Sequence, residues 1–92
     1  MLSGEYKSFY EKGTIESKCN YVDGRQEGPK YYYYENGALK REENYVDGEL
    51  NDMVRDYFPN GRIKKEEFYK SGVLQTSKIY DEGGKLVSSI GS

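Results

Sequence analysis

Hydrophobic positions along this chain recur in a fixed phrase, in which an aromatic residue is followed by two further residues and then by glycine. The glycines that end its seven copies are Gly13, Gly24, Gly37, Gly48, Gly61, Gly72 and Gly83. The aromatics that open the copies are spaced 11, 13, 11, 13, 11 and 11 residues apart. The chain therefore repeats with a period of 24 residues, made of a short half and a long half, and the last long half is two residues shorter.

The repeated glycines lie in sequences that favour tight turns. Four copies end in Asn-Gly or Asp-Gly, which predict two-residue type I′ turns because both turn positions need φ > 0. The segment Glu82-Gly83-Gly84 is predicted to form a three-residue loop instead. Seven turns between short alternating segments predict eight strands, at about 4–11, 14–22, 27–35, 38–46, 49–58, 62–70, 73–80 and 85–90.

This arrangement predicts an all-β fold, a repetitive antiparallel β-meander of about eight strands that forms a single curved and twisted open sheet. The chain is expected to be one domain, 1–92, because its length suits a single small core. Its repeating units are predicted at about 1–24, 25–48, 49–72 and 73–92, with the first and last atypical.

Two-residue loops also predict the register of the strands. The loops at 36–37 and 60–61 place opposite charges across from each other, as a stable antiparallel pair prefers. The predicted charge pairs are Lys30–Glu43, Asp56–Lys65 and Arg55–Glu66. The same counting predicts the pairs Tyr10–Ile15, Tyr34–Leu39, Tyr33–Lys40 and Phe58–Ile63, and an unfavourable Lys7–Lys18 pair.

Side chains alternate between the two faces of a sheet, and directly paired residues share a face. One face is predicted to carry the hairpin clasp, defined as the aromatic and aliphatic residues beside the turns. Its predicted members are Tyr10, Ile15, Tyr21, Tyr34, Leu39, Tyr45, Leu50, Phe58, Ile63, Tyr69, Leu74 and Tyr80. The opposite face is predicted to bind a partner through Tyr31, Tyr33, Tyr57 and Phe68. The competing interpretation of the run Tyr31–Tyr34 is structural, with alternate rings packing on the two faces.

Composition changes this picture in a few respects. Hydrophobic residues make up only 35% and charged residues 33%, but eleven Tyr and three Phe supply the apolar surface of a folded domain. A net charge of −2 with interspersed signs argues against nucleic-acid binding. The sequence has one cysteine, Cys19, and no histidine, so we expect no disulfide, metal or cofactor and no catalytic group of the nucleophile–base type.

No apolar run approaches the ~20 residues that span a bilayer, so no transmembrane segment is predicted. A cytoplasmic location is therefore the default expectation. The alternative is that the sequence is a fragment of a longer or secreted chain, because it begins in the middle of a repeat.

The stretch YYYYENGALKREENYVDG, followed by YFPNGRIKKEEFYKSG, resembles the bacterial MORN-repeat variant, whose members are often described as antitoxins of toxin–antitoxin modules. The residues that match the short half of the family pattern are Tyr34, Gly37, Leu39, Lys40, Glu42, Tyr45 and Gly48, then Phe58, Gly61, Ile63, Lys64, Glu66, Tyr69 and Gly72. Gly28 matches a glycine of the long half, where the next repeat has Asp52 instead.

The resemblance implies a non-catalytic interaction module and not an enzyme, with a protein partner that would be a toxin in the antitoxin case. The first alternative is a structural module that forms homo-oligomers through exposed edge strands. A second alternative, binding of lipid headgroups, is implied by MORN repeats in general and is disfavoured by the acidic balance of this chain.

Overall fold

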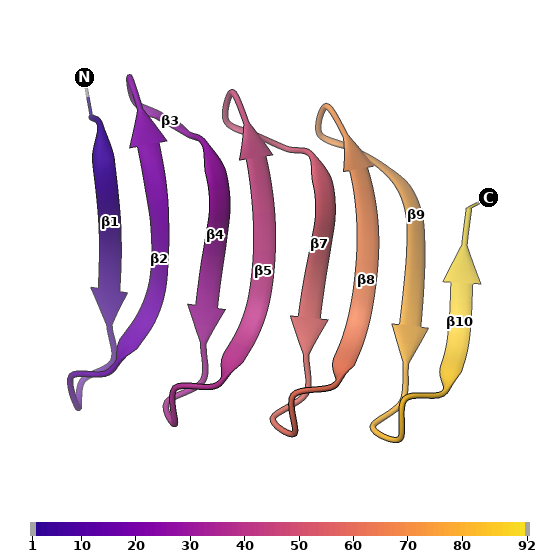
Figure 1. Cartoon of the computed structure of the whole chain (residues 1–92). Coiled ribbons are helices and arrows are strands. Elements are labelled where there is room, and N and C mark those ends of the chain that lie inside the picture. The colour runs from indigo at the N-terminus through magenta and orange to yellow at the C-terminus, as the bar shows by residue number, and fades with distance from the viewer. Residues whose placement is uncertain (1, 92) are drawn as a thin grey trace.

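The computed structural model describes residues 2–91 and forms one open antiparallel sheet, which confirms the predicted fold class. Its strands lie side by side in chain order, with the N-terminus at one edge and the C-terminus at the other (Figure 1). They are β1 Gly4–Phe9, β2 Ile15–Val22, β3 Arg25–Gln26, β4 Gly28–Tyr33, β5 Leu39–Val46, β6 Glu49–Leu50, β7 Asp52–Tyr57, β8 Ile63–Lys70, β9 Val73–Tyr80 and β10 Leu86–Ile90.

The structure has ten strands instead of eight because β6 is separated by one residue from the rest of the predicted strand 49–58, and because β3 forms just before the predicted strand 27–35. Glu27 separates β3 from β4, and Asn51 separates β6 from β7. The residue that follows each interruption has a left-handed backbone, with φ of 80° at Gly28 and 71° at Asp52. Glycine adopts this conformation freely and aspartate tolerates it, which explains why Asp52 can stand where the family pattern has glycine.

The predicted type I′ turns form only in the series of turns that contains Gly24, Gly48 and Gly72. Asp23 and Asp47 have φ of 50° and 51°, and each is followed by a glycine with positive φ. Ser71–Gly72 adopts the same conformation. The prediction is wrong at 36–37 and 60–61, where the loops have three residues and only the glycine has positive φ. In both loops the asparagine side chain accepts a hydrogen bond from the amide two residues later, which stabilises the alternative turn.

The predicted register nevertheless holds in the middle of the strands. A three-residue loop shifts the pairing by one residue, and a β-bulge further along the hairpin shifts it back. The pairs that are confirmed are Lys7–Lys18, Lys30–Glu43, Arg55–Glu66 and Asp56–Lys65. Next to the turns the observed pairs are Phe9–Ile15, Tyr33–Leu39 and Tyr57–Ile63, so the predicted pairs Tyr10–Ile15, Tyr34–Leu39, Tyr33–Lys40 and Phe58–Ile63 are wrong.

The shift by one residue also changes which face these aliphatic residues occupy. Since paired residues share a face, Ile15, Leu39 and Ile63 lie with Phe9, Tyr33 and Tyr57, opposite to the predicted clasp face. Beside the type I′ turns, which have two residues, the observed pairs are Tyr45–Leu50 and Tyr69–Leu74. These residues therefore share a face, as predicted for the hairpin clasp.

The last repeat is one residue shorter than the others, not two. Asp81 donates its backbone amide to the carbonyl of Lys85, as Tyr34 and Phe58 donate to Ala38 and Arg62. Gly84, with φ of 93°, therefore occupies the position of Gly37, whereas Gly83 lies in the middle of the loop without positive φ. Since β9 is continuous, the residue that is missing is the interruption seen at Glu27 and Asn51.

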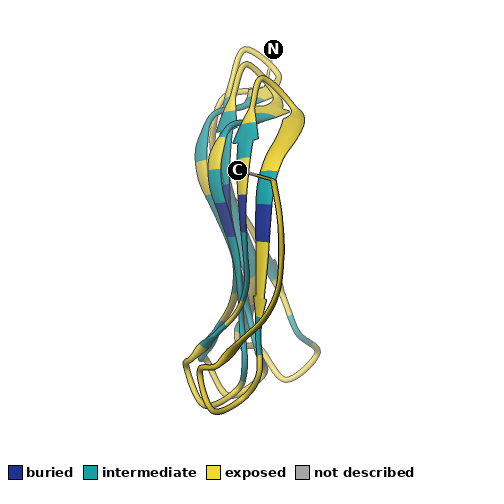
Figure 2. Cartoon of the chain, turned by 90° about the vertical axis from the view of Figure 1, so that its right-hand side faces the viewer, coloured by how far each residue is buried: buried dark blue, intermediate teal, exposed yellow. Residues whose placement is uncertain are grey.

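The sheet is a single layer, measuring 42 × 34 × 13 Å, and it curves along its strands (Figure 2). Its few buried residues lie in the middle of neighbouring strands: Glu43, Val54, Glu67 and Ser77. Among residues 2–91, only Val54 has no exposed surface. We call the face that carries these residues the network face, because charged side chains fill it, and the other the aromatic face, because it carries Tyr31, Tyr33, Tyr57 and Phe68.

Neighbouring repeats are joined at both rows of turns by hydrogen bonds that recur along the chain. The amides of Gly24, Gly48 and Gly72 donate to the carbonyls of Leu2, Gln26 and Leu50. At the row of three-residue turns, the hydroxyls of Tyr10 and Tyr34 donate to the carbonyls of Tyr33 and Tyr57. Tyr10 and Tyr34 therefore each connect their hairpin to the next one through the hydroxyl, whereas Phe58 at the equivalent position has no hydroxyl to donate.

Candidate functional site

The aromatic face contains a row of directly paired residues that crosses the whole sheet. In order across the strands, the row is Lys7, Lys18, Tyr31, Glu42, Arg55, Glu66, Lys78 and Ser89. Positive side chains lie toward both ends and two carboxylates lie near the middle. Opposite charges are adjacent from Glu42 to Lys78, which stabilises the sheet, and the row as a whole has four positive and two negative side chains.

Arg55 is the centre of this row. Its guanidinium lies 2.9 Å from a carboxylate oxygen of Glu66 and 3.8 Å from one of Glu42. The hydrogen bond to Glu66 outweighs the effect of burial and raises the pKa of Arg55. Glu42 also accepts a hydrogen bond of 3.3 Å from the hydroxyl of Tyr57. The hydroxyl of Tyr57, one of the predicted binding residues, is therefore held by the protein itself.

Tyr31 and Tyr33 form a pair on the same face, with ring centroids 6.5 Å apart and rings tilted by 37°. The ammonium of Lys18 lies 5.5 Å from the Tyr31 ring, close enough for a cation–π interaction. Among the described residues, neither hydroxyl has a hydrogen-bond partner, and both side chains are partly exposed. This pair can therefore offer both ring surface and hydroxyl groups to another molecule.

Beside Tyr33 is a shallow, largely apolar hollow of about 410 Å³ near the three-residue turns, lined by Gly13, Thr14, Ile15, Tyr33 and Gly37. The aromatic–aliphatic pairs next to these turns continue it as a stripe along the aromatic face. The stripe consists of Phe9, Ile15, Tyr33, Leu39, Tyr57, Ile63, Tyr80 and Leu86. Its two ends are the most open, since Phe9 is 57% and Leu86 47% exposed.

Phe68 lies apart from the other predicted binding residues. It is on β8, directly opposite Met53 and Thr76, toward the edge with the type I′ turns. Its side chain is 39% exposed. The structure thus brings Tyr31 and Tyr33 together on β4. Tyr57 lies on β7, two strands away across the sheet, and Phe68 lies on a separate part of the aromatic face.

A second polar cluster, centred on Glu43, fills the network face. Glu43 accepts hydrogen bonds from Arg41 Nε at 2.8 Å, from the Tyr45 hydroxyl at 2.8 Å and from the Tyr32 hydroxyl at 3.2 Å. Arg41 also donates from Nη1 to Asp56. Burial opposes the charge of Arg41, but these hydrogen bonds outweigh it and raise the Arg41 pKa. Charged residues on a sheet face are ordinarily solvated, but Glu43 is buried because Arg41, Tyr45 and Tyr32 surround it.

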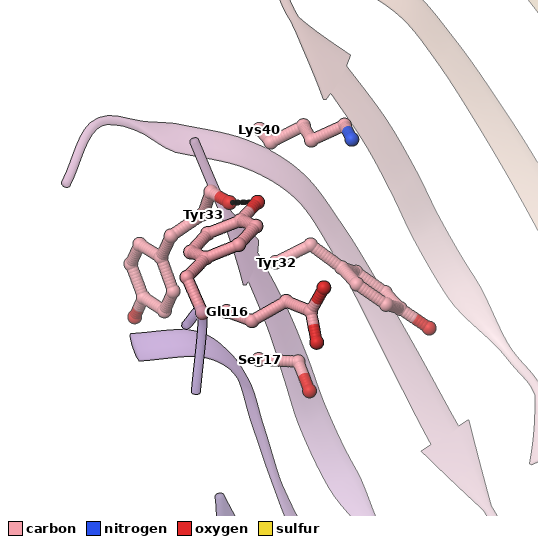
Figure 3. Close-up of a pocket in the computed structure, with 6 residues that line it drawn as sticks. Glu16, Ser17, Tyr32, Tyr33 and Lys40 are labelled. Atoms are coloured by element: carbon pink, nitrogen blue, oxygen red, sulfur yellow. Dashed lines mark hydrogen bonds between the residues drawn. The ribbon is translucent and has the colours of Figure 1, made fainter. Parts of the chain in front are cut away.

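A small hollow between the first two hairpins lies under the Tyr10–Tyr33 hydrogen bond. Glu16, Ser17, Tyr32, Tyr33 and Lys40 surround it, with a volume of about 290 Å³ (Figure 3). Glu16 and Lys40 are the extra residues of the two β-bulges, because Ile15 and Ser17, and likewise Leu39 and Arg41, face consecutive residues of the paired strand. The bulges therefore direct charged side chains toward the joint between repeats.

Tyrosine ionisation is expected to couple folding to alkaline pH. Burial raises the pKa of Tyr45, Tyr57 and Tyr69 above the ordinary value of 10.0, and adjacent carboxylates raise it further. For each of these tyrosines the pKa is higher in the folded than in the unfolded state. Its contribution to the free energy of unfolding is therefore complete below pH 10 and is lost as the pH rises through the folded-state pKa. Urea titrations between pH 8 and 11 should give a falling free energy of unfolding above pH 10.

The variant Tyr45→Phe is the control for this pH dependence. It removes one of the hydroxyls with a raised pKa, so the free energy of unfolding should fall less steeply above pH 10. It also lowers stability at pH 8, because the hydrogen bond to Glu43 is lost. A free energy of unfolding that is constant from pH 8 to 11 would contradict the coupling.

Two groups of features are absent from residues 2–91. No cluster of three or more cysteine or acidic side chains is arranged to hold a metal ion. No helix in this part of the chain is long and apolar enough to cross a membrane. The described surface is defined instead by an aromatic face, a charged network face and two rows of stacked turns.

Taken together, the meander, the period of 24 residues and the stacked turns define a β-repeat protein of the MORN class. The pattern of the family described as MORN repeat variant matches the chain three times, at residues 2–23, 26–47 and 54–75. These matches cover most of the sequence, and the chain belongs to the MORN repeat variant family. MORN repeats are generally non-enzymatic modules of interaction and binding. Comparison with curated proteins gives no match.

Proposed function

We propose that this chain is a non-catalytic protein-binding module that receives an apolar side chain of its partner at Tyr31 and Tyr33. The observation that carries the proposal is the pairing of these two rings, whose hydroxyls have no partner within the described residues, beside an apolar hollow on the aromatic face. Tyrosine is enriched at protein interfaces because one end of its side chain is apolar and the other forms hydrogen bonds.

The surrounding charges suit recognition of a protein more than of a polyanion. Lys18 lies over Tyr31, but Glu42 and Glu66 follow in the same row, and Arg55 is paired with both. A nucleic acid or an anionic surface would meet carboxylates along this row. A mixed protein surface can match both signs, which gives the binding orientation.

The finer version of the proposal makes the partner a toxin and this chain its antitoxin, and it rests on the family resemblance. In that version the aromatic face covers a functional surface of the toxin. The other candidate, a self-assembling structural module, is supported by the exposed, uncharged strand β10 and uses the edges of the sheet instead of its face.

The test is capture of a partner, followed by titration of the purified pair. Tyr31→Ala with Tyr33→Ala should weaken binding by tenfold or more and leave the circular dichroism spectrum unchanged, because both side chains are partly exposed. Phe68→Ala is the matched control on the same face, and Lys30→Ala, beside Tyr32, is the control on the other. Both controls should bind within about twofold of the unchanged protein.

Unchanged affinity of the double variant would refute this surface as the binding site. If Lys30→Ala weakens binding and the double variant does not, the partner binds the network face. The same titration with a nuclease or deaminase toxin encoded beside this chain tests the antitoxin version, and no binding of that toxin would refute it.

A further inference from the structure

The last strand of the sheet lacks the features that usually protect an exposed edge. β10 has the sequence Leu86-Val87-Ser88-Ser89-Ile90, with no charged residue and no proline, and every residue in it is exposed. Leu86, Val87 and Ile90 are 47%, 56% and 65% exposed. Natural proteins place lysine or proline on such edges, because a bare apolar edge strand pairs with other chains.

The interior strands that correspond to β10 show the opposite pattern. The positions of Val87, Ser88, Ser89 and Ile90 in β10 are held in β5 by Lys40, Arg41, Glu42 and Glu43, and in β8 by Lys64, Lys65, Glu66 and Glu67. Charges therefore fill these positions in the covered strands β5 and β8 and are absent from them in β10. This distribution indicates that another strand covers β10.

We infer that β10 of one copy pairs with β1 of a second copy, so that the meander continues from chain to chain. The direction is suitable, because β1 and β10 run oppositely in Figure 1 and all neighbouring strands are antiparallel. The inference does not depend on the proposed function, since it uses the two edges of the sheet and leaves Tyr31 and Tyr33 uncovered.

The register of this joint follows from the three internal joints between hairpins. The equivalent pairs across them are Ser17–Tyr32, Arg41–Asp56 and Lys65–Ile79. Ser88 corresponds to Ser17 and Arg41 on the first strand of the joint, and Ser8 corresponds to Tyr32 and Asp56 on the second. The joint between copies therefore places Ser88 opposite Ser8, Ser89 opposite Lys7 and Ile90 opposite Tyr6.

This register covers exposed apolar side chains on both faces of the sheet. On the network face, Ile90, which is 65% exposed, meets Tyr6, which is 44% exposed. On the aromatic face, Leu86 lies beside Phe9, as Ile15 lies beside Tyr33 at the internal joint, so the apolar stripe continues into the next copy. A β10–β10 joint would leave Tyr6 and Phe9 exposed, and a β1–β1 joint would bring Lys7 toward a second Lys7.

In head-to-tail pairing, each copy that joins leaves one edge strand free for the next, so copies add successively unless the rotation between them closes a ring. Sedimentation velocity of the unchanged protein should show an average mass that rises continuously with concentration. A strict monomer at millimolar concentration would overturn the inference.

Two edge variants distinguish this joint from a symmetric one. Leu86→Lys with Ile90→Lys blocks the C-terminal edge, and Phe9→Lys blocks the N-terminal edge, all at exposed positions. Each variant alone should be monomeric under conditions where the unchanged protein assembles. A mixture should form a heterodimer, because each variant retains the edge that the other lacks. If Phe9→Lys alone forms a dimer, β10 pairs with itself and the head-to-tail inference is wrong.

Cysteine cross-linking tests the register independently. In a Cys19→Ser background, a Lys7→Cys copy and a Ser89→Cys copy should form a disulfide-linked heterodimer on mild oxidation, because directly paired residues are close enough for a disulfide. Lys7→Cys mixed with Lys85→Cys is the control and should remain at least tenfold less cross-linked. Equal cross-linking in the two mixtures would refute the register.

Discussion

Replacing Val54 with aspartate is expected to abolish the folded state or nearly so. Val54 is the only described side chain with no exposed surface, and it pairs directly with Glu67, which is itself buried. The new carboxylate would lose its hydration and face a second buried carboxylate at close range, at a cost of about 5 kcal/mol. A domain of this length is stable by roughly 5–14 kcal/mol in total.

Urea unfolding followed by circular dichroism measures the effect of Val54→Asp. Val46→Asp is the matched control, because it makes the same chemical change at a strand position that is 52% exposed, and it should change stability by less than about 0.5 kcal/mol. If the two variants unfold at the same urea concentration, the middle of the sheet does not act as the core.

Replacing Glu43 with alanine is expected to destabilise the domain by about 3 kcal/mol. The carboxylate is 6% exposed and accepts hydrogen bonds from Arg41, Tyr45 and Tyr32. Its removal leaves two tyrosine hydroxyls without their acceptor and leaves Arg41 with Asp56 as its remaining carboxylate partner. A buried donor that loses its acceptor costs more than the hydrogen bond itself contributed.

A double-mutant cycle separates the network from the loss of packing. Glu43→Ala, Tyr45→Phe and the double variant should give a coupling of about 1 kcal/mol, because each single change removes the same hydrogen bond. Glu35→Ala is the control for loss of a carboxylate, since that side chain is exposed and lies 3.9 Å from Lys12 in its only ion pair among the described residues. Additive effects at Glu43 and Tyr45 would contradict the network.

The turns show where local sequence information was sufficient. Asp23–Gly24 and Asp47–Gly48 form the predicted type I′ turns, because their conformation depends only on residues that tolerate positive φ. Asn36–Gly37 satisfies the same rule, yet it forms part of a three-residue loop. Both turn types need glycine at the same position and differ in the sign of φ at the residue before it. Asparagine is compatible with either sign, so the sequence does not distinguish the two turns.

The predicted binding residues show what pairing alone could not resolve. Tyr31 and Tyr33 alternate with Tyr32 and Tyr34 along one strand, so their shared face follows from the alternation of a β-strand. The contact of Tyr33 with Leu39, and not with Lys40, follows from a bulge that the sequence does not mark. The separation of Phe68 from the other aromatics required the position of every strand in the sheet.

By itself, the sequence determined the repeat, the number of turns, the antiparallel order and the register in the middle of each strand. These features depend on glycine at fixed intervals and on alternation of side chains, both of which are local. The tertiary structure decided which aliphatic residues lie on the aromatic face, that Glu43 is buried, and that Tyr10 and Tyr34 donate to the next hairpin. Those outcomes depend on a one-residue bulge in each hairpin, and a shift of one residue moves side chains from one face of a sheet to the other.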